Sequence, residues 1–510
     1  MNLDLRTIFT HPSVAELSAV VREARPYTAG IILPLPVQQE YYEASYAQKR
    51  LWVLHQLDNA QATYNLSWTY TFEGEQTYHA IKLAFDKLLA RHESLRTTFI
   101  TVEGQPKQKI HPYQGLGPRV SEVNAAHCEN PEETVAKLVR EEAEMPFDLE
   151  QGPLLRLKFI RSGDQSPVVL VLTIHHIVCD GWSAEVLLKE FILLSNDFMA
   201  GTSTLLPELP VQYKDFTAWQ YQLMVEEETR KHQAYWLDRF SGGVPALELP
   251  LFQTRPAVQT VNGATLRRKF SRELTAGLHG MSKQEGVTLF MTLVALVKLL
   301  FHRYTGQNEI VVGTPVNGRN HIDLENQVGY YLNALVLYTV VDAADDFQGL
   351  LGKVKRTVLE AFDHQMYPID KLIEELNLPR DTSRAPLFDV LVVLQNFADQ
   401  ELRSEHSRDA ISALRIQEVD TSTCVNDLLI EFNEYDGLLQ LKLRYNTDLF
   451  KAEQMEYLAG HFQTLAHQII ASPGKCISAC ELLADPERER LLLDFNGAAA
   501  VEKGTGTETI

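Results

Sequence analysis

One stretch of the chain, Val168 to Val178, is a nearly continuous run of apolar residues rich in Val, Leu and Ile. A run of this kind predicts a strand that is buried on both faces. The run includes two adjacent histidines, His175 and His176, and is followed by the turn dipeptide Asp180-Gly181. Because successive side chains of a strand point to opposite faces, the two histidines cannot face the same space. One should face a cavity and the other the core, and the pattern does not say which.

Elsewhere the hydrophobic pattern alternates between helical and strand periods. Apolar residues at helical spacing follow the turn from Ala184 to Met199, so Asp180 is expected either to cap that helix or to hold an arginine under the turn. Further elements are predicted as helices over 80–92, 224–240 and 287–304, strands over 309–315, 334–341 and 390–395, a hairpin of 428–432 with 438–445, and a last helix ending near residue 470. This mixture predicts an α/β fold.

A chain of 510 residues is also too long for one typical domain, so at least two lobes are expected.

The two ends of the chain differ from this body. Leu5 to Arg25 carries apolar residues at helical spacing, which predicts one amphipathic helix without a domain of its own. The stretch Arg25 to Gln39 contains Pro and Gly and predicts an extended linker. The start lacks the features of a signal peptide, and no apolar segment reaches the roughly 20 residues that a membrane span needs. We therefore expect no membrane insertion.

Composition narrows the possible partners and the compartment. The net charge of -20 and the isoelectric point near 5.3 argue against nucleic acid and anionic membrane surfaces, because both attract basic patches. Five cysteines at irregular spacing do not form a disulfide framework in a chain of this length, which predicts a reducing, cytoplasmic location. Cys476 and Cys480 are the only close pair, and core packing explains them better than a zinc site does. No metal site is predicted.

Several common enzyme motifs are absent from the sequence. The chain has no GxSxG elbow, no Walker A loop and no dinucleotide fingerprint, which argues against serine hydrolase, NTPase and Rossmann functions. A lone buried histidine is more often a hydrogen-bonded core residue than a catalyst. The arrangement His-His-x-x-x-Asp-Gly at the end of a buried strand favours chemistry over that alternative.

The segment His175 to Ser183, HHIVCDGWS, resembles the active-site signature of the condensation domains of non-ribosomal peptide synthetases, relatives of chloramphenicol acetyltransferase. Other motifs of that family recur in order along the chain. They are matched by SYAQKRLW at 45–52 and by the segments 91–99, 213–220, 328–333, 364–368 and 380–389. The resemblance covers about Tyr42 to Leu483.

The resemblance implies an α/β fold of two chloramphenicol acetyltransferase-like lobes, each a mixed sheet packed with helices, which form a V with a tunnel between them. It also implies an order of parts: the C-terminal helix of an upstream peptidyl carrier domain at 1–25, a linker at 26–40, the N-terminal lobe at 41–215, the C-terminal lobe at 216–486, and the partly disordered start of a linker to an adenylation domain at 487–510. The attachment serine of the carrier would lie upstream of Met1. The chain should therefore carry no phosphopantetheine itself.

By the same resemblance, His176 is the catalytic residue that accepts a proton from the attacking amine or orients it by a hydrogen bond. The backbone N–H of Gly181 is the candidate for stabilising the oxyanion. His175 would be structural, and Asp180 would hold the turn through an arginine such as Arg96. The family motifs add candidates for the tunnel, for several of which packing is an equally good explanation: Trp182, Ser183, Arg91, Trp219, Asn333 and Arg384.

The implied reaction joins an acceptor amine to a donor thioester, each carried on the phosphopantetheine arm of a separate carrier domain. The expected partners of a monomeric chain are thus upstream and downstream carriers and an adjacent adenylation domain, and no cofactor is bound covalently. SYAQKRLW resembles the subtype that accepts an L-configured donor. Two alternatives stay open: a free-standing acyltransferase of the same superfamily that uses coenzyme A, and an inactive module that docks carriers or tailoring enzymes. The carrier-like and linker-like ends disfavour the first, and the intact signature disfavours the second.

Overall fold

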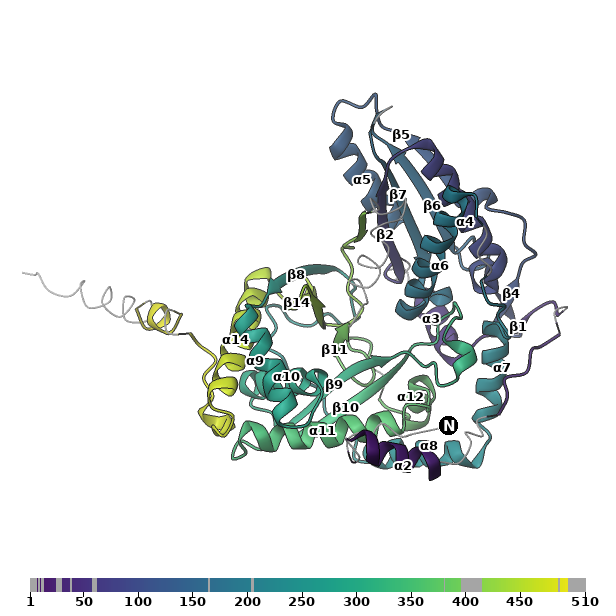
Figure 1. Ribbon diagram of the computed structural model, residues 1–510. Helices are drawn as coiled ribbons and strands as arrows, with labels where there is room; N and C mark the ends of the chain where they lie inside the picture. Colours follow the sequence, from purple (N-terminus) through teal and green to yellow (C-terminus); the bar gives the residue numbers. More distant parts are fainter. Residues whose placement is uncertain are drawn as a thin grey trace, which may run out of the picture.

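The computed structural model describes residues 7, 10, 13–23, 30–36, 39–56, 62–163, 166–202, 206–379, 381–395, 415–484 and 487–493. Within these residues the chain forms three β-sheets covered by helices. Figure 1 shows two lobes that diverge like the arms of a V, the N-terminal lobe in blue and the C-terminal lobe mainly in teal, green and yellow. Each lobe is built on one large mixed sheet, as predicted.

The N-terminal lobe is organised around β7 (Val168–His175), the middle strand of a five-stranded sheet with the order β12-β2-β7-β6-β5. The other strands are β2 (Asn65–Phe72), β5 (Val120–Asn124), β6 (Leu155–Arg161) and β12 (Arg415–Glu418). Helices α4 (Glu75–Arg91) and α6 (Gly181–Ala200) pack against each other, and α5 (Pro131–Glu144) packs against β2 and β7. Figure 1 shows α5 on one face of the sheet and α4 and α6 on the other. Because both faces of β7 are covered, a nearly unbroken apolar sequence is required there.

A small sheet with the order β1-β4-β3 flanks this lobe. Its strands are β1 (Tyr42–Glu43), β3 (Thr97–Val102) and β4 (Gln105–Ile110). Helix α3 (Tyr46–His55) follows β1, and Ser45 is its N-cap. The side chains of Ser45 and Gln48 each accept a hydrogen bond from the backbone N–H of the other residue, which makes a capping box.

The C-terminal lobe contains a six-stranded sheet with the order β10-β9-β11-β13-β14-β8. Its strands are β8 (Gly263–Lys269), β9 (Glu309–Val316), β10 (Asn333–Val340), β11 (Val390–Gln395), β13 (Leu428–Tyr435) and β14 (Leu438–Asn446). Its helices are α8 (Glu227–Arg239), α9 (Arg272–Gln284), α10 (Leu289–Thr305), α11 (Phe347–Asp363), α12 (Ile369–Leu376) and α14 (Ala452–Ala471). Helix α10 is buried along most of its length and packs against α9, α11 and α14, so it forms the centre of this core.

The predicted hairpin is confirmed in β13 and β14. Asp436 and Gly437 have φ values of 56° and 67°, the left-handed conformation that a tight two-residue turn between twisted strands requires. The predicted strand from Val168 to Val178 is wrong at its end, because β7 stops at His175 and residues His176–Val178 form a 3-10 turn. The side chain of His175 caps this turn by accepting a hydrogen bond from the N–H of Ile177. Such a local bond competes with the sheet ladder, and hydrophobic periodicity does not report it.

Two segments from the second half of the chain return to the N-terminal lobe. β12 pairs antiparallel with β2 and adds an edge strand to the sheet. Residues 317–332, which link β9 to β10 and are called the 317–332 connection below, place Val328 and Tyr330 in the apolar core of the N-terminal lobe. The two lobes are thus interlocked by chain segments as well as packed. The predicted division of the chain at residue 215 stays a prediction.

The ends of the chain are described in part. Helix α2 (Val14–Glu23) lies where an N-terminal helix was predicted, and its assignment to a carrier domain stays a prediction. Residues 494–510, the end of the tail predicted to be partly disordered, lie outside the described residues, as do residues 26–29 and 37–38 of the predicted linker. Among the described helices, none alone is long and apolar enough to cross a membrane, and the pair α9 and α10 meets that criterion only together, with a bend of 106° between them.

Candidate active site

The signature His175 to Ser183 forms a tight turn between β7 and α6. Asp180 is the N-cap of α6, since its Oδ1 accepts a hydrogen bond of 2.8 Å from the backbone N–H of Ser183. A carboxylate at this position pairs with a backbone donor that the helix leaves unsatisfied and interacts favourably with the helix dipole. Asp180 therefore fixes the point at which the turn enters the helix.

His175 is enclosed within the N-terminal lobe. Its side chain is fully buried, with the rings of His55 and Phe147 at centroid distances of 5.3 and 5.9 Å. Its Nδ1 accepts the 3.1 Å hydrogen bond from the N–H of Ile177, so this nitrogen carries no proton. Burial lowers the pKa of His175 well below its ordinary value. A neutral imidazole that shapes the turn is the arrangement expected of a structural residue.

His176 differs from His175 because its side chain is only partly buried. Its ring lies against that of Tyr330, with centroids 5.0 Å apart and planes at 73°. Burial lowers the pKa of His176 below its ordinary value, while the Asp180 carboxylate and the backbone of His176 and Cys179 act in the opposite direction. The imidazole is therefore neutral near pH 7, and its unprotonated nitrogen can accept a proton or a hydrogen bond.

The arginine that pairs with Asp180 is Arg319, on the 317–332 connection, and not Arg96. Nη1 and Nη2 of Arg319 donate to the two carboxylate oxygens at 2.9 and 3.1 Å, and both side chains are almost completely buried. The backbone N–H of Tyr331 donates to the same carboxylate at 2.9 Å. Burial raises the pKa of Asp180, but the charge and hydrogen bonds of Arg319 outweigh it, so the net pKa is lowered. Asp180 is accordingly an ionised anchor for the turn.

The predicted partner Arg96 contacts another part of the lobe. Its Nη1 donates to the carbonyl of His111 at 2.6 Å, and its Nη2 lies 3.8 Å from Glu93. Arg91, the other arginine of the same motif, pairs with Glu190 on α6 at 3.0 Å. The sequence could not identify Arg319, because an ion pair between residues 139 positions apart has no local pattern.

The three residues after Asp180 have different surroundings. The hydroxyl of Ser183 donates to the carbonyl of Gly329 at 2.8 Å and accepts from its N–H at 3.0 Å, which ties α6 to the 317–332 connection. Trp182 is exposed, and its Nε1 donates to the carbonyl of Glu325 at 2.8 Å. A Cβ added at Gly181 would meet no atom within 4 Å, so open space adjoins the first residue of α6. The first N–H groups of a helix have no partner within the helix and can face such a space.

Two further candidates, Trp219 and Asn333, line a cavity of about 40 Å³ at the junction of the two lobes. Trp219 belongs to α7 (Tyr213–Leu223) and is almost completely buried. Asn333 is an anchor for the start of α12. Its amide nitrogen donates to the carbonyls of Gln365 and Tyr367, both at 2.9 Å, while its oxygen accepts from the N–H of Ile369 at 3.0 Å.

Arg384 belongs to a separate network. It pairs with Asp389 at 3.0 Å and makes two hydrogen bonds to Glu248, at 2.9 and 2.8 Å. Arg380, at the start of the same motif, lies outside the described residues. The structure thus brings His175, His176 and residues 180–183 together in one turn, while the contacts of Arg91, Arg96 and Arg384 lie elsewhere.

A second ion pair near His176 was not predicted. Nε of Arg50 on α3 lies 3.1 Å from Oδ1 of Asp370 on α12, and 31% and 14% of the two side chains are exposed. Arg50 also interacts electrostatically with Tyr330, the ring partner of His176. Because α3 lies in the N-terminal lobe and α12 in the C-terminal lobe, this pair joins the lobes beside His176. Arg50 lies within the SYAQKRLW motif, but nothing in the sequence indicates Asp370 as its partner.

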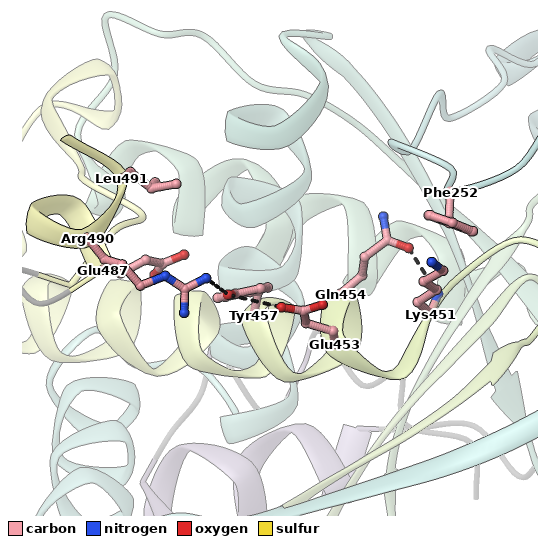
Figure 2. Close-up of a pocket in the computed structure, with 8 residues that line it drawn as sticks. All are labelled: Phe252, Lys451, Glu453, Gln454, Tyr457, Glu487, Arg490 and Leu491. Atoms are coloured by element: carbon pink, nitrogen blue, oxygen red, sulfur yellow. Dashed lines mark hydrogen bonds between the residues drawn. The ribbon is translucent and has the colours of Figure 1, made fainter. Parts of the chain in front are cut away.

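A wider groove of about 400 Å³ lies on the C-terminal lobe, along α14 and the helical turn at 487–493 (Figure 2). Its lining residues are Phe252, Lys451, Glu453, Gln454, Tyr457, Glu487, Arg490 and Leu491. Figure 2 shows Arg490 directed at Tyr457, whose hydroxyl accepts a hydrogen bond of 2.9 Å from it. None of the predicted site residues lines this groove.

The order of motifs and the geometry of the turn agree with one family. A sequence model of the Condensation domain family matches residues 38–492, nearly the whole chain. This chain belongs to the condensation domain family. The family match confirms the resemblance inferred from the motifs. Condensation domains of non-ribosomal peptide synthetases are acyltransferases that form amide bonds.

Relatives of this condensation domain include much longer proteins. It is 36% identical over 500 residues to tyrocidine synthase 3 of Brevibacillus parabrevis, and 34% identical over 496 residues to gramicidin S synthase 2 of Brevibacillus brevis. These matches cover 98% and 97% of this chain but 7% and 11% of the two relatives. The chain therefore spans a small fraction of the length of the relatives it matches.

Solved structures share the fold of this condensation domain. The X-domain from teicoplanin biosynthesis matches with a TM-score of 0.78 at 23% identity, covering 89% of this chain and 100% of that chain. The first condensation domain of the calcium-dependent antibiotic synthetase matches with a TM-score of 0.72 at 18% identity, covering 88% and 100%. At these identities the likeness establishes the fold alone.

We predict that Arg319→Met strongly destabilises the domain, because it leaves the Asp180 carboxylate buried without its partner. Removing one partner of a buried ion pair typically costs about 3–5 kcal/mol. Arg96→Met is the matched control and should cost about 1 kcal/mol, since it removes one hydrogen bond to a carbonyl and a loose ion pair. Chemical denaturation measures both variants, and equal losses would contradict the assignment of Arg319.

We also predict that His175→Asn is more stable than His175→Ala. An asparagine oxygen can accept the hydrogen bond of Ile177 in place of Nδ1, whereas alanine leaves that N–H unpaired and opens a cavity. The two variants should differ by about 1–3 kcal/mol in the free energy of unfolding. Identical thermal midpoints would show that the Nδ1 contact does not hold the 3-10 turn.

Proposed function

We propose that this condensation domain forms a peptide bond between an acceptor aminoacyl group and a donor aminoacyl or peptidyl thioester, each held on the phosphopantetheine arm of a separate carrier domain. The observation that carries the proposal is the position of His176. Its imidazole is neutral and partly accessible, and the turn that bears it is held by Asp180 and Arg319 between segments of both lobes. One proton-accepting group thus lies where the two lobes meet.

In the proposed reaction, the amine nitrogen of the acceptor attacks the carbonyl carbon of the donor thioester and produces a tetrahedral oxyanion. The C–N bond forms as the amine gives up a proton, and the C–S bond then breaks to release the thiol of the donor carrier. His176 either accepts that proton or orients the amine by a hydrogen bond. The N–H of Gly181, beside open space, is the proposed oxyanion donor.

The two arms are proposed to reach His176 from opposite ends of a tunnel between the lobes. Arg50 and Asp370 support this path, because they face each other across the junction of the two lobes and 31% and 14% of their side chains remain exposed. Trp182, Trp219 and Asn333 are the further residues that we assign to the tunnel or its surroundings.

We assign the donor to an upstream carrier and the acceptor to a downstream carrier, with an adenylation domain following this chain. The sequences at 1–25 and 487–510 support this order, as does the length of the relatives, of which the chain covers 7% and 11%. The SYAQKRLW motif supports an L-configured donor. A cytoplasmic location is supported by the free thiols of all five cysteines, and the proposed state is a monomer.

The proposed function is tested by incubating the chain with two loaded carriers and measuring dipeptidyl thioester on the acceptor carrier by mass spectrometry. We expect product with the parent, and a rate at least about 100-fold lower with His176→Ala. His79→Ala, which changes an exposed histidine on α4, should match the parent. Equal rates with free coenzyme A thioesters would favour the free-standing acyltransferase, and carrier binding without product would favour the docking module.

The pH dependence of the reaction follows from the lowered pKa of His176. The neutral imidazole is the active form, so kcat/KM should rise with pH through the pKa of His176 and level off above it. Because burial lowers this pKa from its ordinary value of 6.5, the midpoint of the acid limb should lie below 6.5. Single-turnover rates measured from about pH 5 to 8 give this midpoint. A midpoint above 6.5 would contradict the role assigned to His176.

A further inference from the structure

The stretch predicted to be an extended linker carries one buried side chain. Residues 30–36 precede β1, and Ile32 is 2% exposed, whereas its neighbours Ile31 and Leu33 are 79% and 70% exposed. An extended chain directs successive side chains to opposite sides, so a buried Ile32 between two exposed neighbours indicates that its side of the segment faces the protein. Only the middle of these three side chains is inserted into the protein.

Ile32 enters an apolar cluster that joins α7 to the 317–332 connection. The cluster contains Tyr213 and Phe216 of α7 and Leu324 and Tyr331 of the connection. The backbone also docks, because the N–H of Leu35 donates a hydrogen bond of 2.7 Å to Oδ1 of Asp215. The other oxygen of that carboxylate accepts a 2.7 Å bond from the backbone N–H of Gln212 at the start of α7. The linker is thus held by both packing and hydrogen bonding.

The cluster that receives Ile32 also adjoins the candidate active site. The backbone N–H of Tyr331 donates to Asp180 at 2.9 Å, and the Tyr331 ring lies 4.1 Å from the guanidinium of Arg319. The hydroxyl of Tyr213 donates to the carbonyl of Tyr330 at 2.5 Å. The linker therefore packs against the same connection that holds the turn of the signature.

We propose that Ile32 is a positioning residue for the condensation reaction: inserted into this cluster, it keeps Tyr331 and Arg319 in place against Asp180. The inference rests on the proposed function. Protein interiors are close-packed, so loss of the Ile32 side chain leaves a void that the 317–332 connection can fill only by shifting. A displacement of about 1 Å at a catalytic group can lower a rate by about 100-fold.

A consequence concerns the extent of the functional domain. The N-terminal lobe was predicted to start at residue 41, and the family match begins at residue 38. Both boundaries exclude Ile32. If Ile32 is a positioning residue, the segment that the reaction needs begins at about residue 30. The docked segment also lies between the predicted carrier tail and the lobes. An upstream carrier that drew Ile32 out of the cluster would thereby disturb the turn.

The experiment uses the full chain with two loaded carriers and compares Ile32→Ala and Ile32→Val with the parent. Ile31→Ala and Leu33→Ala are matched controls, because they shorten the exposed neighbours on the same segment. For each variant we measure kcat, the KM for each carrier and the thermal midpoint. We expect Ile32→Ala to lower kcat at least about tenfold at unchanged KM, and Ile32→Val to lower it about threefold. The two controls should match the parent.

A folded Ile32→Ala variant with the kcat of the parent would overturn the inference. So would a change confined to KM, which would indicate a carrier-docking surface, or losses of similar size in the two controls. Should Ile32→Ala fail to fold, Ile32→Val decides, and a parent-like kcat in that variant overturns the inference. A parent chain that forms no amide bond refutes the proposed function and the inference together, whereas variants equal to an active parent refute the inference alone.

Discussion

The ion pair between Asp180 and Arg319 is the contact on which the active-site turn depends. Both side chains are almost completely buried, and a charge in that position is costly unless it is paired and hydrogen-bonded. The Asp180 carboxylate meets this requirement with the guanidinium and with backbone N–H groups of Ser183 and Tyr331. Because these donors come from α6 and from the 317–332 connection, the turn is formed only when both segments are in place.

The two histidines of the turn show how surroundings assign different roles to one residue type. His175 lies among His55 and Phe147, and its Nδ1 is occupied by the N–H of Ile177. His176, one residue later, has left the strand and lies partly accessible beside Tyr330. Burial keeps both rings neutral near pH 7, because it lowers the pKa of each, so neither contributes a fixed positive charge to the turn. The two rings differ in how far they are exposed and not in their protonation.

The contacts that join the two lobes differ in how much of each is exposed to solvent. The Asp180–Arg319 pair is almost completely buried, whereas the side chains of Arg50 and Asp370 remain partly exposed. β12 adds a third link by completing the edge of the N-terminal sheet with a strand from the second half of the chain. Interfaces between lobes usually permit relative motion unless they are extensive. The buried pair and the added strand are two such contacts between the lobes, one at the turn and one at the sheet edge.

The sequence by itself determined the features that have local causes. Residues adjacent in the chain or at a fixed period determine the hairpin turn at Asp436-Gly437, the α/β class and the family. Alternation also predicted that the two histidines face different surroundings, and they do, but the cause is that the strand ends at His175 and His176 lies in the 3-10 turn. Only the tertiary structure decided that Arg319 and not Arg96 holds Asp180, and that Ile32 is buried while Leu33 is exposed. These contacts join residues more than 100 positions apart. Several side chains of the same chemistry could make each contact, and the way the lobes fold together decides which one does.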